Sequence, residues 1–231
     1  MRRIHLVDAA RGFAVILMVA YHFCFDLNYF GIIHQDMNHD RFWLASRALI
    51  VSLFLLLVGT SLVLASGMES RHFWKRQARL LAAALAVTVG SYAMFPKSYI
   101  YFGILHFIFV ASLIGRLFLN FPKAALASGL FVIALGLNYS SRIFDLPFMN
   151  WIGLMTYKPY TEDYVPLFPW LGVVLIGIFL GNLLVAKSQP KWLFADFPAF
   201  RFPSILGRHS LAIYLLHQPI LIGIFYLFTG R

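Results

Sequence analysis

The sequence predicts an all-α, polytopic membrane protein, a bundle of about seven transmembrane helices with a cytoplasmic N-terminus. Hydrophobic residues make up 61% of the 231 residues and charged residues 12%, and the mean hydropathy is +0.77. Long apolar runs recur along the chain, near the length of about 20 residues that a helix needs to cross a bilayer. A soluble core would not need so many runs, whereas a bundle in lipid presents apolar side chains outward as well as inward. We treat residues 1–231 as a single integral membrane domain.

Polar residues divide the apolar sequence into seven predicted helices. They cover residues 7–30, 43–66, 77–95, 99–119, 124–140, 165–186 and 208–228. Basic residues in the short connections set the orientation, because lysine and arginine gather on the cytoplasmic side. With the N-terminus inside, this side holds Arg2, Arg3, Arg71, Lys75, Arg76, Arg79, Arg116, Lys123, Lys187, Lys191, Arg201 and Arg208, and the outside keeps Arg41, Lys97, Arg142, Lys158 and Arg231. The tryptophans near the predicted helix ends agree with this arrangement: Trp43, Trp74, Trp151, Trp170 and Trp192.

Two connections are longer than a turn requires. The outer one, residues 140–164, mixes charged residues with Trp151 and Tyr157, which suits either a solvated loop or a lid that contacts sugar. The inner one, residues 187–208, carries three prolines among aromatic residues. We expect it to lie along the inner membrane interface, because proline would break a continuous helix there.

The first predicted helix carries a polar stripe: Asp8, Arg11, His22 and Asp26 share one face at helical spacing. Asp8 and Arg11 are predicted to form an i, i+3 pair. A charged residue at mid-membrane costs about 2.5 to 3.5 kcal/mol, so such residues usually face a protein interior or a wet cavity, often with a function. Asp26 lies one turn beyond His22 and could hydrogen-bond one ring nitrogen, which leaves the other nitrogen to take a proton from a hydroxyl or an amine. We predict His22 as the catalytic residue, with Asp26 and Arg11 in support. The alternative is a histidine that only joins packed helices.

Two further histidines, His106 and His217, lie in predicted membrane helices and suggest a polar cavity. Histidines can bind zinc or haem, but metal ligands usually come with carboxylates or close spacing, and leucine and isoleucine surround these two histidines. The only cysteine, Cys24, allows neither an intramolecular disulfide nor a cysteine cluster. We therefore expect no metal site.

Basic residues gather before the third predicted helix, in the segment that contains Lys75, Arg76 and Arg79. The two arginines are i, i+3 neighbours, and each could donate paired hydrogen bonds to the phosphates of a cytosolic donor. Arginines beside a helix are also plain topology signals, so this segment alone supports both interpretations equally. The net charge of +10 fits the anchoring of helix ends, and we expect no nucleic-acid partner.

Several segments in order along the chain resemble known membrane acyltransferases. The spacing from Arg11 to His22, the Arg76-x-x-Arg79 pair and the segment 206–219 (LGRHSLAIYLLHQP) are similar to the acyltransferase 3 group. A closer resemblance is to the heparan-alpha-glucosaminide N-acetyltransferase catalytic-domain family, in residues 7–14 (VDAARGFA), 53–62 (LFLLLVGTSL), 103–106 (GILH) and 165–172 (VPLFPWLG).

This resemblance implies transfer of an acyl group, usually acetyl from cytosolic acetyl-CoA, to a sugar hydroxyl or amine on the far side of a cell (inner) membrane. It implies that His22 is the catalytic residue. His22 would act either as a general base in a ternary complex or as a carrier that becomes acetylated and passes the group on, and the sequence does not choose between these two mechanisms. The residues expected to bind the donor are Arg11, Lys75, Arg76, Arg79, His106 and His217. The implied partners are the acyl-CoA donor, a glycan or amino-sugar acceptor and membrane lipid, with a homodimer as one possible assembly. The first outer connection, residues 31–42, is compact, and His34 and His39 are candidate contacts there.

Three other functions use the same polar residues. A small-molecule or proton-coupled transporter could line its path with the stripe of the first helix. An electron-transfer subunit could use His22, His106 and His217 as haem ligands and would then be coloured. A purely structural subunit would leave the cost of the buried charges unexplained.

Overall fold

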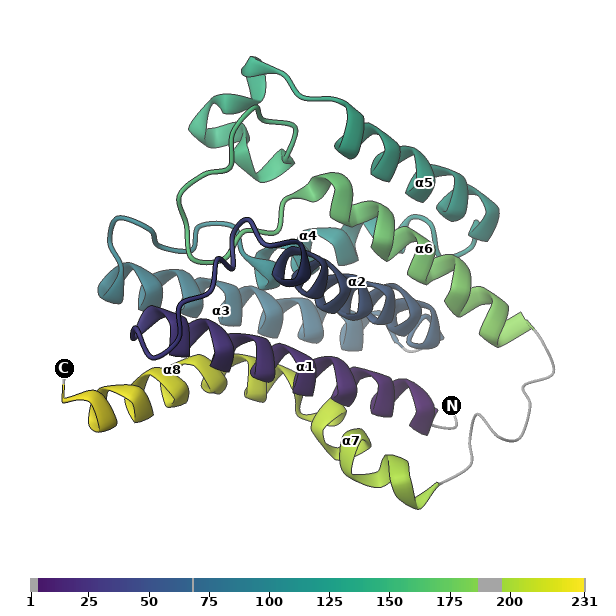
Figure 1. Ribbon diagram of the computed structural model, residues 1–231. Helices are drawn as coiled ribbons and strands as arrows, with labels where there is room; N and C mark the ends of the chain where they lie inside the picture. Colours follow the sequence, from purple (N-terminus) through teal and green to yellow (C-terminus); the bar gives the residue numbers. More distant parts are fainter. Residues whose placement is uncertain (1–3, 68, 187–196, 231) are drawn as a thin grey trace. The chain divides into compact units, whose positions relative to one another are not determined.

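The computed structural model describes residues 4–67, 69–186 and 197–230, and within these ranges the chain forms helices and no strands (Figure 1). The α-helices are α1 His5–Tyr29, α2 Arg41–Leu64, α3 Ser70–Met94, α4 Ile104–Arg116, α5 Pro122–Asn138, α6 Leu167–Ala186, α7 Pro198–Arg208 and α8 Ser210–Thr229. Two short 3-10 helices, η1 Arg142–Asp145 and η2 Pro147–Ile152, lie between α5 and α6. The predicted all-α class is confirmed.

Within the described residues, four helices are long and apolar enough to cross a membrane: α1, α2, α6 and α8. The helices α4 and α5 are apolar but shorter. With 13 residues, α4 is about 20 Å long at 1.5 Å per residue, less than the hydrocarbon core of about 30 Å. The chain is therefore a multi-pass membrane protein by length and composition, while seven crossings and a cytoplasmic N-terminus stay predictions.

The third helix begins earlier than the sequence pattern predicted. Residues 71–76, which we placed in a connection, form the first turns of α3 after Ser70. The segment contains neither glycine nor proline, and its two arginines and its lysine favour a helix. The fourth helix is shorter than predicted, because residues 99–103 precede its first turn at Ile104.

The inner connection contains a helix that the sequence analysis missed. Residues 187–196 lie outside the described residues, but Pro198–Arg208 forms α7. Pro198 stands in its first turn, where the missing N–H has no helical partner to lose. Pro203 lies inside the helix and is buried, so packing compensates for one missing hydrogen bond. We expected proline to break a continuous helix in this connection, and did not predict the separate helix α7, which continues through Pro203 and ends at Arg208 before α8 begins at Ser210.

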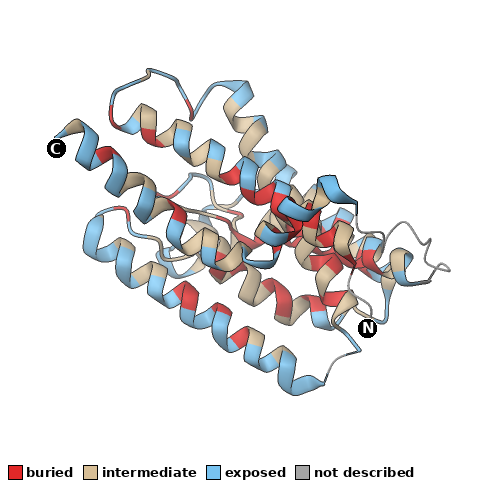
Figure 2. Cartoon of the chain, turned by 90° about the horizontal axis from the view of Figure 1, so that it is seen from below, coloured by how far each residue is buried: buried red, intermediate tan, exposed pale blue. Residues whose placement is uncertain are grey.

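The chain forms two compact units, which we describe separately. The first unit comprises Met1–Phe54 and Gln189–Arg231, and the second comprises Leu55–Ser188. The helix α2 contributes its first half to the first unit and its second half to the second. Figure 2 shows that most helices carry buried and exposed residues side by side, as expected of helices with one inward and one outward face.

In the first unit, small residues bring the backbones of α1 and α7 together. A Cβ atom at Gly12 would collide with the carbonyl oxygen of Pro203, and one at Gly207 would collide with the carbonyl oxygen of Asp8. The Ser204 hydroxyl donates a hydrogen bond of 3.2 Å to the carbonyl oxygen of His5. In lipid, where the hydrophobic effect does not drive helices together, close packing at small residues stabilises such pairs.

The second unit uses the same device. A Cβ atom at Gly59 of α2 would collide with the backbone of Val174 in α6, and one at Gly177 of α6 would collide with that of Leu56. The Thr60 hydroxyl lies 2.9 Å from the carbonyl oxygen of Leu56 and 3.1 Å from that of Gly177. These contacts give a packing reason for the Val58-Gly59-Thr60 stretch of the family resemblance.

The outer connection between α5 and α6 is held by its own acidic residues. Asp145 accepts two hydrogen bonds of 2.8 Å from the backbone N–H and the hydroxyl of Thr156. Asp163 Oδ2 accepts a hydrogen bond of 2.9 Å from Ile104 N at the start of α4. The hydroxyl of Tyr164 donates to a backbone carbonyl oxygen of η2, and burial raises the pKa of this tyrosine. Both carboxylates thus have structural partners, while sugar contacts by this connection stay a prediction.

Replacing Asp163 by alanine is expected to destabilise the start of α4. The change removes the acceptor of the Ile104 N–H, and loss of such a cap costs about 1 kcal/mol. Thermal unfolding in detergent micelles measures the effect. The matched control is Glu69→Ala, because Glu69 holds the N-cap position of α3 without a side-chain capping bond. Equal melting temperatures for the two variants would contradict the capping role of Asp163.

Candidate functional site

Four polar side chains meet between two apolar helices of the first unit: His22 and Asp26 from α1, and His217 and Gln218 from α8. The exposed fraction is 2% for Asp26 and 9% for His217. The rings of His22 and His217 lie edge to face, with centroids 4.8 Å apart and an interplanar angle of 72°. Gln218 Nε2 donates a hydrogen bond of 2.7 Å to Asp26 Oδ1. The structure thus brings together three residues that the sequence analysis predicted for the site.

Backbone hydrogen bonds fix the tautomers of both histidines. His22 Nδ1 lies 2.9 Å from the carbonyl oxygen of Met18, one turn earlier in α1. His217 Nδ1 lies 2.7 Å from the carbonyl oxygen of Tyr214 and 3.2 Å from that of Ile213. Because a carbonyl oxygen only accepts, each Nδ1 carries the hydrogen, and in the neutral ring each Nε2 keeps a lone pair. Both Nε2 atoms are therefore suited to receive a proton.

Three buried acceptor atoms of this cluster have no hydrogen-bond partner among the described residues: Asp26 Oδ2, His217 Nε2 and Gln218 Oε1. A buried polar atom without a partner costs about 1 to 3 kcal/mol, so a native protein retains it where a ligand or a function uses it. All three atoms accept hydrogen bonds. The group that fits here is therefore one that brings donors, such as a hydroxyl or an amine.

The partners of His22 and Asp26 differ from those that the sequence spacing predicted. We expected the carboxylate of Asp26 to hold a ring nitrogen of His22. In the structure, Asp26 instead accepts a hydrogen bond from Gln218, and His22 Nδ1 forms a hydrogen bond with the Met18 carbonyl oxygen. The physical reason is that a backbone carbonyl one turn back lies within reach of Nδ1 in any helix, whereas Gln218 comes from α8 and sequence spacing along α1 cannot show it.

Arg11 lies on α1 but away from this cluster. Its guanidinium forms the predicted ion pair with Asp8, at 2.9 Å. His22 lies eleven positions further along the helix, or about 16 Å at 1.5 Å per residue. A catalytic or donor-binding role of Arg11 stays a prediction, in which it would contact a different part of a long substrate.

Among the predicted donor-binding residues, Lys75, Arg76 and Arg79 lie in the second unit. On α3, Lys75 and Arg79 are exposed and Arg76 is half-buried. Beside them the sequence analysis missed Gln77, which is 1% exposed and whose amide atoms have no partner among the described residues. The signal in the sequence is the position of Gln77 at the start of the third predicted membrane helix, because an amide in a membrane helix needs partners. The donor-binding roles of the three basic residues are still predictions.

His106 has a structural explanation at the start of α4. Its Nδ1 accepts a hydrogen bond of 3.3 Å from the backbone N–H of Gly103. Its Nε2 lies 3.0 Å from the hydroxyl of Thr88, which donates in turn to the carbonyl oxygen of Ile100. Both ring nitrogens are thus used within the fold. A Cβ atom at Gly103 would collide with Asp163, which explains the glycine of the Gly103-Ile104-Leu105-His106 motif.

The two histidines of the first outer connection are both exposed. His39 Nδ1 lies 3.0 Å from each carboxylate oxygen of Asp36, and this hydrogen bond lowers the pKa of Asp36. Roles of His34 and His39 in substrate contact stay predictions. In the described part of the chain, no group of three or more His, Cys, Asp or Glu is placed to hold a metal ion.

Gln218 is the residue of this cluster that the sequence analysis left without a role. Replacing it by leucine is expected to destabilise the protein by about 1 to 3 kcal/mol, because the buried Asp26 carboxylate loses its described partner. In the double variant with Asp26→Leu, part of the loss should be recovered, since no unpaired carboxylate remains. Thermal unfolding of the parent, the two single variants and the double variant measures this coupling. Strictly additive losses would show that the two side chains do not interact.

The residues of this cluster lie in a region that matches a known protein family. The family model described as heparan-alpha-glucosaminide N-acetyltransferase, catalytic, matches residues 3–219, a range that includes all four residues of the cluster. No curated protein and no solved structure gives a significant match. Since the family model covers nearly the whole chain, the protein belongs to the heparan-alpha-glucosaminide N-acetyltransferase catalytic family and is, in its general class, a membrane acetyltransferase.

Proposed function

We propose that this protein transfers an acetyl group from cytosolic acetyl-CoA to a hydroxyl or amine of a sugar on the extracytoplasmic side of a cell inner membrane. The observation that carries the proposal is the cluster of His22, Asp26, His217 and Gln218, where lone pairs of buried acceptor atoms gather between α1 and α8. Membership of an acetyltransferase family supports the reaction class.

In this proposal His22 Nε2 takes the proton of the acceptor. The freed lone pair of the acceptor oxygen or nitrogen forms a bond to the acetyl carbonyl carbon, the carbon–sulfur bond breaks, and the imidazolium returns the proton to the leaving thiolate. The Met18 carbonyl oxygen holds the ring in the required tautomer throughout. If His22 Nε2 attacks the acetyl carbonyl carbon first, the carbon–sulfur bond breaks and the CoA thiolate leaves. The acceptor oxygen or nitrogen then bonds to the acetyl carbon, the bond from this carbon to Nε2 breaks, and the acceptor's proton passes to the released thiolate.

The neighbouring groups orient the acceptor. His217 Nε2, Asp26 Oδ2 and Gln218 Oε1 can each accept a hydrogen bond from a hydroxyl or an ammonium group. A carboxylate in this place favours an acceptor that carries positive charge before it loses its proton. The cluster therefore suits an amino sugar at least as well as a neutral hydroxyl.

The test is acetyl transfer by the purified parent protein in proteoliposomes. Acetyl-labelled acetyl-CoA is supplied on one side, and amino sugars or their hydroxyl analogues on the other; free thiol and acetylated sugar are both quantified. We expect the two products to appear in equal amounts and the amino sugar to be the better acceptor. Movement of the sugar across the bilayer without thiol release would contradict the proposal and indicate a transporter.

A further inference from the structure

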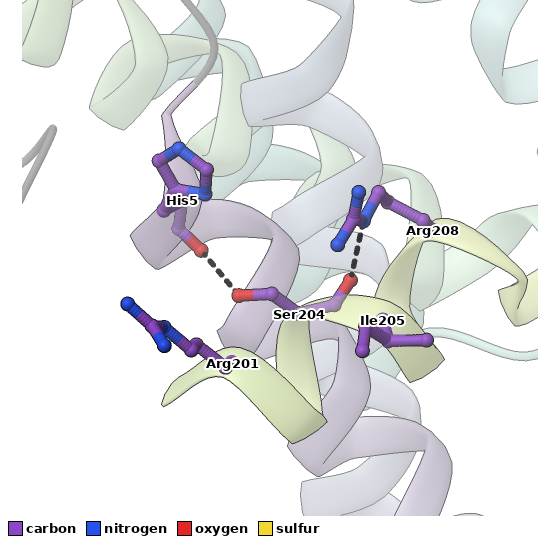
Figure 3. A pocket seen from close by; sticks show the side chains of 5 residues that line it. All are labelled: His5, Arg201, Ser204, Ile205 and Arg208. Atoms are coloured by element: carbon purple, nitrogen blue, oxygen red, sulfur yellow. Dashed lines mark hydrogen bonds between the residues drawn. The ribbon is translucent and has the colours of Figure 1, made fainter. Parts of the chain in front are cut away.

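A pocket of about 240 Å³ lies in the first unit, between the start of α1 and one face of α7 (Figure 3). Five described residues line it: His5, Arg201, Ser204, Ile205 and Arg208. Neither arginine belongs to the predicted site; both are among the basic residues that predict the orientation of the chain. The pocket is separated from His22 by most of α1, since His22 lies 17 positions after His5, or about 25 Å along the helix.

Two arginine side chains give the pocket a positive charge. Arg201, Ser204 and Arg208 stand at i, i+3 and i+7 and so share one face of α7. Figure 3 shows the two guanidinium groups on either side of Ser204, with the imidazole of His5 coming from the facing helix. Among the five described lining residues there is no acid. The nearest carboxylate on α1, that of Asp8, is bound to Arg11.

Hydrogen bonds to the backbone hold these side chains in place. Arg208 Nε donates a bond of 3.2 Å to the carbonyl oxygen of Ser204, and no other partner of this guanidinium is found in the described ranges. Ser204 Oγ donates in turn to the carbonyl oxygen of His5, which ties α7 to the start of α1. Arg208 is therefore oriented while its terminal N–H groups stay available for a ligand.

We infer that this pocket binds a phosphate group. Arginine presents planar paired donors that match phosphate oxygens, and the first turn of α1 adds the positive end of a helix dipole. A volume near 240 Å³ lies below the range of about 300 to 1,000 Å³ typical of pockets for drug-sized molecules, so the pocket fits one phosphate group of a larger ligand. The phosphate belongs either to a soluble phosphate ester or to a lipid headgroup. The inference concerns binding alone and goes beyond the proposed transfer.

The test compares phosphate binding in the parent and in Arg201→Gln/Arg208→Gln. Calorimetry in phosphatidylcholine nanodiscs uses adenosine 3′,5′-bisphosphate, which has phosphate groups but no thioester. A second arm measures enrichment of phosphatidylglycerol over phosphatidylcholine around the purified protein. We expect the double variant to bind the bisphosphate, or to enrich phosphatidylglycerol, at least tenfold less well than the parent, and we expect the parent affinity to fall as salt is added.

The matched control is Arg41→Gln/Arg142→Gln, which removes two exposed arginines that do not line the pocket. It should bind like the parent. Loss confined to the bisphosphate identifies a soluble phosphate ester, and loss confined to phosphatidylglycerol identifies a lipid headgroup. If the pocket variant and the parent behave alike in both arms, or the parent binds neither probe, the inference is wrong.

A charge-conserving variant separates binding from folding. Arg201→Lys/Arg208→Lys keeps both charges but not the paired donors of the guanidinium, so its affinity should lie between those of the parent and the glutamine variant. If the glutamine variant does not fold, the lysine variant alone decides the question, and parent-like affinity in it would overturn the guanidinium site. Because neither arm requires turnover, failure of acetyl transfer leaves this test unaffected.

Discussion

Acetyl transfer is expected to fall by about 10² to 10⁴ when His22 is replaced by glutamine, the range that general-base catalysis contributes. The Nε2 atom of His22 is the proton acceptor of the proposed reaction, and glutamine keeps a polar side chain of similar length without a basic nitrogen. Donor binding should be unchanged, because the change affects the proton transfer and not the phosphate contacts. The measurement is initial rate of thiol release together with acetyl-CoA affinity by calorimetry.

The matched control for this change is His209→Gln, which alters an exposed histidine at the break between α7 and α8. It should keep the parent rate. Transfer at the parent rate by His22→Gln would remove His22 from the mechanism, and loss of donor affinity equal to the loss of rate would make it a binding residue instead. Mass spectrometry of the parent, quenched after exposure to acetyl-CoA without acceptor, distinguishes an acetyl-histidine carrier from a general base.

Replacing Gly12 by leucine is expected to destabilise the first unit by about 3 kcal/mol, the upper end of the usual cost of overpacking. Any side chain at Gly12 meets the backbone carbonyl of Pro203, which cannot rotate away, so α1 and α7 must separate. Separation would also break the hydrogen bond from the Ser204 hydroxyl to the carbonyl oxygen of His5. Thermal unfolding in detergent micelles, followed by helical circular dichroism, measures the loss.

The control is Gly223→Leu in α8, which belongs to the same unit and has open space around the position of a Cβ atom. This change should be neutral or slightly stabilising, because leucine favours a helix by somewhat under 1 kcal/mol over glycine. A Gly12 variant as stable as the Gly223 variant would show that α1 and α7 do not pack as described.

The sequence determined the class of the protein and the composition of its polar stripe. Apolar runs of fixed length predict helices because every backbone group in lipid must be bonded within the segment. Spacing along one helix likewise predicts the Asp8–Arg11 ion pair and the shared face of His22 and Asp26. These properties are local, since they follow from the pitch of a single helix, and the structure agrees with them.

Only the tertiary structure decided which helices meet and which atoms are left for a ligand. Sequence spacing along α1 suggested that Asp26 binds His22, whereas packing of α8 against α1 brings Gln218 to Asp26 and His217 to His22. The phosphate pocket depends in the same way on α7, a helix that the prolines concealed. The reason is physical: hydrophobic periodicity shows which face of a helix is apolar, but in a membrane both lipid and protein accept apolar faces, so the partner of each helix is set by the close fit of small residues and by polar groups from distant parts of the chain.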